Sequence, residues 1–318
     1  MQDETMGEDG KEDDMKDTFG PAAEAEYFAP AETSQQGGRP SGMRHSIRPR
    51  RALTRIADTD TPREDTPAPS DLVEGSRRSL PDRDAPRWQE LPEDDFGLRK
   101  QYEGHAPLVD FHRDGPLRRA FDLLRTRLRH TAQENRWTNI AIASPTSGCG
   151  NTFTAVNLAL SLARIPSSRT MLMDFNLRNP GVADMLGMTP RGPMRDYLRG
   201  KTPMRDHIVR VGDTLALSLN EGAETDAAET LQDPDTDLTL SRMRVALRPE
   251  LVLYDMPPML EHDDVSAFLP QLDGVLLVSD GTQTMARQLV ECERMLDGQV
   301  QLLGVILNRA RASSIAKY

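Results

Sequence analysis

Short apolar runs alternate with longer amphipathic stretches between about residue 115 and residue 308. Runs of five to seven residues, apolar on both faces, predict buried strands at 139–144, 170–174, 214–219, 251–255, 274–279 and 302–308. The stretches between them predict helices near 152–164, 193–208, 236–247, 262–270 and 284–297. This alternation indicates an α/β fold, with a parallel sheet covered by helices on both faces. Ligands of such sheets bind outside the carboxyl ends of the strands.

A further helix is predicted ahead of the first strand, at 115–133. Four apolar residues recur there at helical spacing, behind a predicted Asp114 cap and an early Pro116. The opposite face of this helix is basic and carries Arg118, Arg119, Arg125, Arg127 and Arg129.

The first third of the chain differs in composition from the rest. Ten of the 23 prolines fall within the first 92 residues, in runs that show no apolar period. Segments of this kind cannot bury enough apolar surface to fold. We therefore predict a disordered region over 1–104 and one folded domain over 105–318.

The net charge of −11 is unevenly distributed. Residues 1–18 carry eight acids and two lysines, whereas residues 39–55 carry six arginines and no acid. Charge blocks are typical of solvated tails, and these two blocks would attract each other. The alternative is that 39–55 associates peripherally with an anionic membrane surface or an acidic partner. Binding to a specific nucleic acid is disfavoured, because the chain is acidic overall and the basic run has no aromatic platform.

Targeting signals are not evident in the sequence. The apolar runs are shorter than the ~18 to 20 residues that cross a bilayer, and the acidic N-terminus does not resemble a secretory signal. We therefore expect a cytoplasmic protein that reaches a membrane only through a partner or through 39–55. Cys149 and Cys292 lack metal-ligand spacing, so neither a disulfide framework nor a zinc site is expected.

The candidate chemistry follows the first predicted strand, in the sequence SPTSGCGNT at 144–152. Gly148 and Gly150 let the backbone curl so that several N–H groups point at one anion, and the next helix adds its positive end. Thr152 has the position whose hydroxyl ligates Mg²⁺ in phosphate-binding loops of this kind. Asn151, however, stands where the loop signature requires a lysine. The glycines alone could equally form a tight turn between a strand and a helix.

Two carboxylates strengthen the case for phosphate chemistry. Asp174 and Asp255 each end a predicted strand, so both are expected at the same edge of the sheet as the loop. Either one alone could be a helix cap. Together with Thr152 they predict a site for Mg²⁺ and phosphate.

At this point the chain resembles a known family, the bacterial tyrosine kinases of capsule and exopolysaccharide synthesis, within the P-loop superfamily that includes the partition-type ATPases. The resemblance covers about residues 115–318. It is carried by RAFDLLRT (119–126), SPTSGCGNT (144–152), MLMDFNLRNP (171–180), DYLRG (196–200), YDMPP (254–258) and GVILN (304–308).

The resemblance implies ATP and Mg²⁺ as ligands, with a role for each matching position. The loop residues Gly148, Cys149, Gly150, Asn151 and Thr152 would hold the ATP phosphates. Mg²⁺ would be bound by Thr152, Asp255 and Asp174, and Asp174 would also activate the incoming hydroxyl. Asn308 would lie near the adenine. The tyrosine-rich tail of the family is reduced here to Tyr318, the candidate phosphorylation site.

The sequence also departs from the family pattern. Asn151 replaces the phosphate-contacting lysine, Asn176 an acid, and Ser147 the usual loop proline. In the helix with which the family builds rings, the charges at Arg119 and Asp122 are reversed ahead of Arg125. The sequence therefore leaves open whether the chain forms a homo-oligomer.

These departures leave three hypotheses. The first is a kinase-like regulator of polysaccharide polymerisation and export that binds Mg-ATP weakly, has reduced or absent autokinase activity, and works with an inner-membrane polysaccharide co-polymerase. The second is an active tyrosine autokinase in which an arginine replaces the lysine, Arg178 being the obvious nearby cation. The third is a partition-type positioning ATPase, which Thr146 disfavours because that branch carries an early lysine there.

Overall fold

A seven-stranded sheet organises the part of the chain that the computed structural model describes, namely residues 85–94, 108–109 and 115–310. The strand order is β3-β4-β2-β5-β1-β6-β7, and every neighbouring pair is parallel except β3 and β4. The strands are β1 (Asn139–Ala143), β2 (Thr170–Asp174), β3 (Ile208–Val211), β4 (Leu215–Ser218), β5 (Leu251–Asp255), β6 (Gly274–Asp280) and β7 (Gln301–Asn308).

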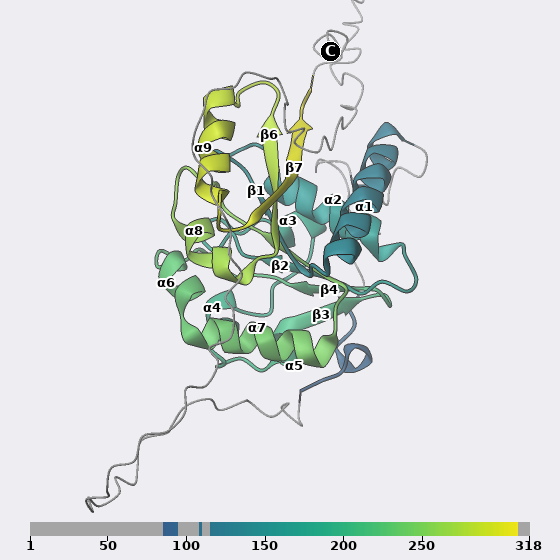
Figure 1. Cartoon of the computed structure of the whole chain (residues 1–318). Helices are drawn as coiled ribbons and strands as arrows, with labels where there is room; N and C mark the ends of the chain where they lie inside the picture. Colours follow the sequence, from purple (N-terminus) through teal and green to yellow (C-terminus); the bar gives the residue numbers. More distant parts are fainter. Residues whose placement is uncertain (1–84, 95–107, 110–114, 311–318) are drawn as a thin grey trace, which may run out of the picture. The chain divides into compact units, whose positions relative to one another are not determined.

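Helices cover both faces of this sheet (Figure 1). One face packs against α1 (Pro116–Asn135), α2 (Asn151–Ala163) and α3 (Val182–Leu186). The other packs against α4 (Met194–Leu198), α6 (Ala227–Gln232), α7 (Pro234–Leu247), α8 (Asp264–Phe268) and α9 (Ala286–Leu296), and α5 (Met204–His207) leads into β3. The predicted α/β fold with a sheet covered on both sides is confirmed.

The strands alternate their side chains between two apolar cores. In β1, Ile140 and Ile142 lie in the core under α1 and α2, whereas Ala141 and Ala143 lie in the opposite core. This alternation follows from the two-residue period of a strand, and burial on both faces explains why residues 140–143 are all apolar.

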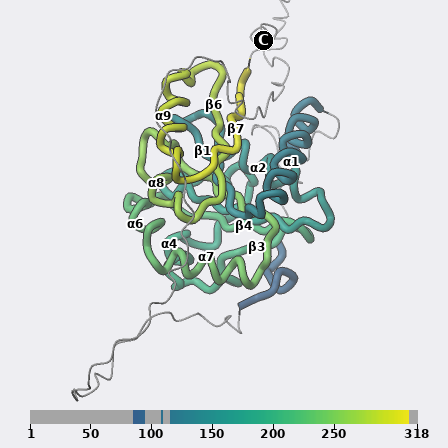
Figure 2. Tube along the Cα trace, viewed as in Figure 1, coloured from purple at the N-terminus to yellow at the C-terminus, as the bar shows by residue number. Residues whose placement is uncertain are grey.

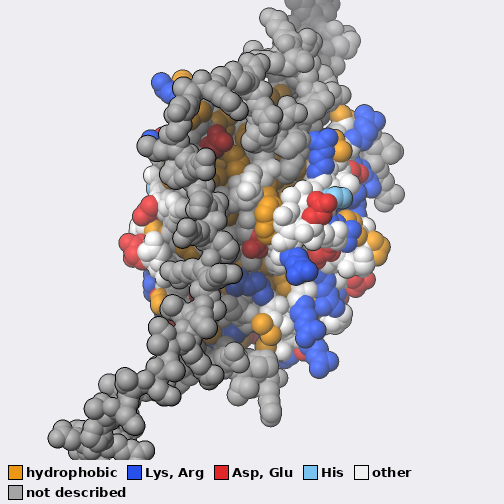
Figure 3. Space-filling view, viewed as in Figure 1, with side chains coloured by type: hydrophobic (Ala, Val, Ile, Leu, Met, Phe, Trp, Pro, Cys, Tyr) orange, Lys and Arg blue, Asp and Glu red, His pale blue; other side chains and the backbone are white. Residues whose placement is uncertain are grey.

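Two predicted helices differ from the structure. The helix ahead of β1 begins at Pro116 with Gly115 as its N-cap, so the predicted Asp114 cap is wrong by one residue, because proline takes the first helical position. Its basic side chains contribute to the Lys and Arg that gather on the side where α1 lies (Figure 3). The helix predicted at 193–208 is instead α4, α5 and the start of β3, since Gly200 (φ 69°) and Pro203 interrupt it.

Residues 85–94 are ordered on the domain, although the sequence predicted disorder there. Trp88 is 1% exposed, and its indole N–H donates to the carbonyl of Asp213 over 2.8 Å. The backbone next to Glu93 bridges to the free edge of β3, with bonds from Asp94 N to Arg210 O and from Arg210 N to Pro92 O. Figure 2 shows this segment beside β3. The predicted disorder is therefore wrong for these ten residues. Burial of one tryptophan and two backbone hydrogen bonds hold the segment on the domain despite its polar composition.

The remaining N-terminal predictions lie outside the described residues. This holds for the disorder predicted over 1–84 and 95–104, for the basic segment 39–55 and for the boundary at 104–105. The division into two regions therefore stays a prediction.

His207 is a buried, unpaired base at the end of α5. Its ring stacks on Tyr197 with centroids 4.6 Å apart and planes 7° from parallel. The residue is 2% exposed, and neither ring nitrogen has a hydrogen-bond partner among the described residues. Burial lowers the pKa of His207 from 6.5 to about 4.

His207→Phe is expected to reduce the acid sensitivity of the fold. His207 takes up a proton near pH 6.5 in the unfolded chain, but only near pH 4 in the folded protein. The free energy of unfolding is therefore unaffected by protonation of His207 above pH 6.5, and it falls as the pH is lowered from 6.5 to 4. The loss amounts to at most about 3 kcal/mol. Urea unfolding at pH 7 and pH 4.5 should show a smaller pH difference in His207→Phe than in wild type. His130→Gln, at an exposed histidine, is the control, and equal pH differences in all three proteins would contradict the assignment.

Candidate functional site

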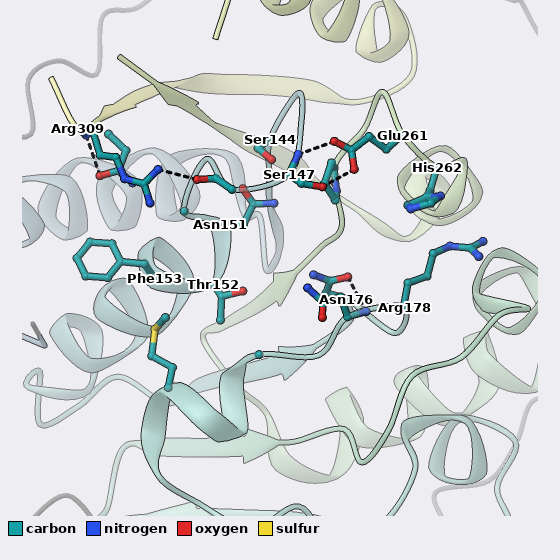
Figure 4. Close-up of a pocket in the computed structure, with 17 residues that line it drawn as sticks. Ser144, Ser147, Asn151, Thr152, Phe153, Asn176, Arg178, Glu261, His262 and Arg309 are labelled. Carbon is teal, nitrogen blue, oxygen red and sulfur yellow. Dashed lines mark hydrogen bonds between the residues drawn. The ribbon is translucent and has the colours of Figure 1, made fainter. Parts of the chain in front are cut away.

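A cavity of about 490 Å³ opens at the edge of the sheet where the parallel strands end (Figure 4). The loop 144–150 joins β1 to α2 and forms one wall of this cavity. Among the residues predicted for the site, those that line it are Gly148, Gly150, Asn151, Thr152, Arg178 and Asn308. The structure therefore brings together residues that lie up to 160 positions apart in the sequence, counting from Gly148 to Asn308.

The loop has the backbone conformation that the glycines were expected to allow. Gly148 and Gly150 have φ values of 79° and 98°, which side chains with a Cβ rarely adopt. A Cβ on Gly150 would also lie 2.3 Å from the Asn308 amide nitrogen. The space next to Gly150 is thus filled by Asn308, whose Nδ2 donates to the carbonyl of Cys149 over 2.9 Å. Cys149 itself turns inward and is 1% exposed.

Asp174 and Asp255 lie side by side, because β2 and β5 are neighbours in a register that pairs these two residues directly. Both are fully buried. One Asp174 oxygen accepts from the N–H groups of Gly181 (3.1 Å) and Val182 (3.0 Å). The other Asp174 oxygen and both Asp255 oxygens have no hydrogen-bond partner in the part of the chain that the structure describes.

Such buried, unpaired acids resist ionisation. Burial raises the pKa of Asp174 from 3.8 to about 7, against the opposing effect of backbone N–H groups of which Val182 contributes most. Burial and the Asp174 charge raise the pKa of Asp255 well above its usual value, while the nearby Thr152 hydroxyl lowers it in part. The carboxylate oxygens of Asp174 and Asp255 that lack hydrogen-bond partners could bind a hard cation, and such a cation would supply the missing interactions.

Asn151 does not project a donor group freely into the cavity. It is the first residue of α2, is 9% exposed, and donates from Nδ2 to the carbonyl of Met256 over 2.9 Å. Its Oδ1 is buried and has no partner among the described residues. The position that the loop signature reserves for a positive charge therefore holds a neutral side chain bound to the end of β5.

Arg178 is less available to the loop than the sequence implied. Its Nε and one terminal nitrogen bind both oxygens of the buried Asp264 at 2.8 and 2.9 Å. The other terminal nitrogen donates to the carbonyl of Thr225 over 2.6 Å. Figure 4 shows the side chain running away from Asn151 and the loop. Arg178 thus lines the cavity, but its charge is paired with α8.

Two charged residues at the cavity were missed by the sequence reasoning. The guanidinium of Arg309 donates from Nη1 to the carbonyl of Gly148 over 2.9 Å and to the carboxylate of Asp280 over 2.6 Å. Glu261 accepts from the Ser147 N–H over 2.6 Å and from the Ser147 hydroxyl. Arg309 had a signal, because it directly follows Asn308 at the end of the last strand. Glu261 lies in a loop with no motif that would have indicated it.

Asp122, one of the two reversed-charge positions of α1, and Arg125 find partners on α2 and at its end. Asp122 accepts from the Ser161 hydroxyl over 3.0 Å and from the guanidinium of Arg164. Arg125 donates to the carbonyl of Ser161 over 3.0 Å. Arg119 is exposed. Two of the three positions at which the family carries ring-forming charges thus bind α1 to α2.

Tyr318 and the basic segment 39–55 lie outside the described residues. Within the described ranges, every helix is too short or too polar to cross a bilayer.

The loop, the paired acids at neighbouring strand ends and the sheet topology define a P-loop NTPase-like protein. Comparisons with known proteins narrow this class. The chain is 31% identical over 186 residues to the succinoglycan biosynthesis transport protein ExoP of Rhizobium meliloti, which covers 56% of this chain and 23% of ExoP. It is 25% identical over 202 residues to the putative tyrosine-protein kinase AmsA of Erwinia amylovora, covering 61% of this chain and 27% of AmsA.

A shorter relative matches over most of its length. The tyrosine-protein kinase CpsD of Streptococcus agalactiae is 26% identical over 203 residues, which are 62% of this chain and 85% of CpsD. The chain spans about a quarter of the length of ExoP and AmsA. No protein-family profile matches the sequence.

Among solved structures, the kinase domain of the Escherichia coli tyrosine kinase ETK shares the fold. The TM-score is 0.57 at 22% identity, over 70% of this chain and 89% of that domain. The chimeric protein CapA2B2 gives a TM-score of 0.58 at 19% identity, over 63% of this chain and 88% of the chimera. The resemblance to the bacterial tyrosine-kinase family, with its P-loop fold, is confirmed.

Proposed function

We propose that this chain binds Mg-nucleotide at the loop 144–152 and acts as a kinase-like regulator of exopolysaccharide or capsule polymerisation and export. The observation that carries the proposal is the pair of buried acids, Asp174 and Asp255, which lie side by side with unpaired oxygens, Asp255 being close to the Thr152 hydroxyl. Natural proteins leave buried charges unpaired only at a cost, and a bound cation removes that cost.

The residues fit a magnesium ion and a phosphate group. Thr152, Asp174 and Asp255 would hold the metal, and the loop N–H groups with the start of α2 would hold the phosphates. Within the described ranges, groups of three or more His, Cys, Asp or Glu side chains able to hold a metal do not occur. A cation here would therefore share the two acids with a hydroxyl, waters and phosphate oxygens, as Mg²⁺ does in nucleotide sites. When bound, it would neutralise charge on the phosphates.

The proposed reduction in phosphoryl transfer follows from Asn151. A lysine would place a full positive charge against the phosphates, whereas the asparagine is neutral and bound to Met256. Backbone N–H groups can still bind the nucleotide phosphates. Without the lysine, however, less positive charge stabilises the negative charge of the transition state. By the family resemblance, Asp174 is the proposed acceptor of the proton from an incoming hydroxyl.

The cellular role rests on the relatives. ExoP, AmsA and CpsD are named as a succinoglycan biosynthesis transport protein, a putative tyrosine-protein kinase and a tyrosine-protein kinase. By this likeness, an inner-membrane polysaccharide co-polymerase is the proposed partner and the cytoplasm the proposed location. Tyr318 is the proposed phosphate acceptor should transfer occur.

Calorimetry with ATP, with and without Mg²⁺, tests the proposed function. We expect wild type to bind Mg-ATP, and Asp255→Asn to bind it about 10–100-fold more weakly, as loss of a metal-site partner does. Without Mg²⁺ the same variant should bind ATP about as well as wild type, because burial raises the pKa of Asp255 and leaves little charge there for the substitution to remove.

Asp206→Asn, at an exposed acid on α5, is the matched control and should behave as wild type. Wild type that binds no nucleotide would overturn the proposal and leave a scaffold that keeps only the fold. Strong wild-type phosphorylation of Tyr318, detected by mass spectrometry and lost in Asp174→Ala, would instead make the chain an active autokinase.

A further inference from the structure

The end of β7 contacts the phosphate loop through two consecutive residues. Asn308 Nδ2 donates to the carbonyl of Cys149, and Arg309 Nη1 donates to the carbonyl of Gly148, each over 2.9 Å. Two consecutive loop carbonyls are therefore held by two consecutive residues that arrive from the far end of the chain.

These two bonds fix the direction of the loop N–H groups. A trans peptide is planar, and its N–H points opposite to its C=O. The carbonyls of Gly148 and Cys149 point to Arg309 and Asn308, so the N–H groups of Cys149 and Gly150, which share those peptides, point away from β7. Two adjacent N–H groups held in one direction form the kind of nest that binds an anion.

The position of Arg309 is itself fixed by a buried acid. Asp280, at the end of β6, is 1% exposed and accepts from the Thr282 N–H over 2.7 Å as well as from Arg309. The hydrogen bonds from Thr282 and Arg309 hold the pKa of Asp280 below its usual value, although burial opposes them. Asp280 therefore stays ionised and holds the guanidinium against the loop.

Arg309 retains donors for a ligand, whereas Arg178 has engaged its nitrogens. All three side-chain nitrogens of Arg178 have partners, on Asp264 and Thr225. Within residues 85–94, 108–109 and 115–310, the side-chain hydrogen bonds of Arg309 use Nη1 alone, and its side chain is 57% exposed. Figure 4 shows Arg309 beside the loop and Arg178 directed away from it.

We propose that Arg309 takes over part of the role of the missing loop lysine, as a positioning residue that orients the loop N–H groups and places a positive charge next to the nucleotide phosphates. The inference rests on the proposed nucleotide-binding function. It identifies Arg309 as the positively charged side chain of that site. It replaces Arg178, which the sequence had indicated for this role.

Mg-ATP affinity of Arg309 variants, measured by calorimetry on the full chain, tests the inference. Arg309→Gln removes the charge and should weaken Mg-ATP binding about tenfold, as loss of a charge-assisted hydrogen bond does. Arg309→Lys keeps the charge and should recover most of the affinity. Arg294→Gln is the matched control, because Arg294 is a surface arginine on α9 paired with Glu291, and it should bind as wild type does.

The outcomes separate the inference from the function on which it rests. Wild-type affinity in Arg309→Gln would overturn the role of Arg309 and leave the nucleotide site intact. Equal losses in Arg309→Gln and Arg309→Lys would overturn the role of its charge. Absence of Mg-ATP binding in wild type would overturn both proposals. Thermal unfolding of each variant without ligand should match wild type within about 2 °C, which shows that a change in affinity does not come from a damaged fold.

Discussion

Asn151→Lys is expected to increase ATP turnover by about 10²–10³-fold, provided that the chain binds Mg-ATP as proposed. A charge aimed at the phosphates in the transition state contributes roughly 3 to 4 kcal/mol to the barrier. In wild type this position holds a neutral amide that donates to the carbonyl of Met256. The substitution removes a buried carbonyl group, Oδ1, that has no partner among the described residues.

The measurement is the steady-state rate of ADP formation, together with mass spectrometry of Tyr318. Asn151→Gln is the matched control, since it lengthens the side chain without adding charge, and its rate should stay near that of wild type. Equal rates in wild type and Asn151→Lys, at saturating Mg-ATP, would show that the lost lysine does not limit turnover. Another residue would then limit ATP turnover, and Asn176, which replaces an acid of the family pattern, would be the next position to substitute.

The parallel strands were predictable because their position in the fold leaves little freedom in sequence. Strands β2 and β5 match the predicted ranges to the residue. A strand buried on both faces must be apolar throughout, and such a run stands out between amphipathic helices. The antiparallel β3 was missed, because its residues Ile208–Val211 lie at the sheet edge and continue a helix-like pattern. Gly212, with φ 61°, marks the turn after it and was the available signal.

The backbone part of the site was predictable for a related reason. The positions of Gly148, Gly150, Asp174 and Asp255 follow from where strands end, and chain order gives those ends. The roles of Arg178 and Arg309 depend on which acid each side chain reaches. Asp264 and Asp280 are both buried acids, on α8 and β6, and only the packing of those elements decides which arginine faces the loop. Sequence spacing contains no direct information on that choice.

Composition misled the prediction for the N-terminal region at one place. The segment around Trp88 is rich in charge and proline, which predicts a solvated chain. A single large side chain changes this balance, because tryptophan buries ~150–250 Å² of surface. Its indole N–H also needs a partner, and the carbonyl of Asp213 in the β3–β4 turn provides one. The open edge of β3 supplies the backbone groups that pair with Pro92 and Asp94.

Trp88→Ala is accordingly expected to lower the free energy of unfolding by about 3–5 kcal/mol, the usual cost of removing a buried tryptophan. Trp88 is 1% exposed, and the guanidinium of Arg169 lies 5.5 Å from the centre of its ring. The substitution leaves a cavity, removes the hydrogen bond to the carbonyl of Asp213 and leaves Arg169 without its aromatic partner. Urea unfolding, followed by circular dichroism, measures the loss.

Trp88→Phe separates the ring from its hydrogen bond. It keeps an aromatic ring near Arg169 but removes the donor to Asp213 and part of the buried ring, so it should cost at least about 1 kcal/mol and less than Trp88→Ala. Trypsin gives a local reading of the same effect, because a cut after Arg87 requires the segment to leave the sheet edge. We expect this cut to be faster in Trp88→Ala than in wild type. Unchanged unfolding free energy and unchanged cleavage in Trp88→Ala would mean that residues 85–94 contribute nothing to the fold, and that the composition had indicated their state correctly.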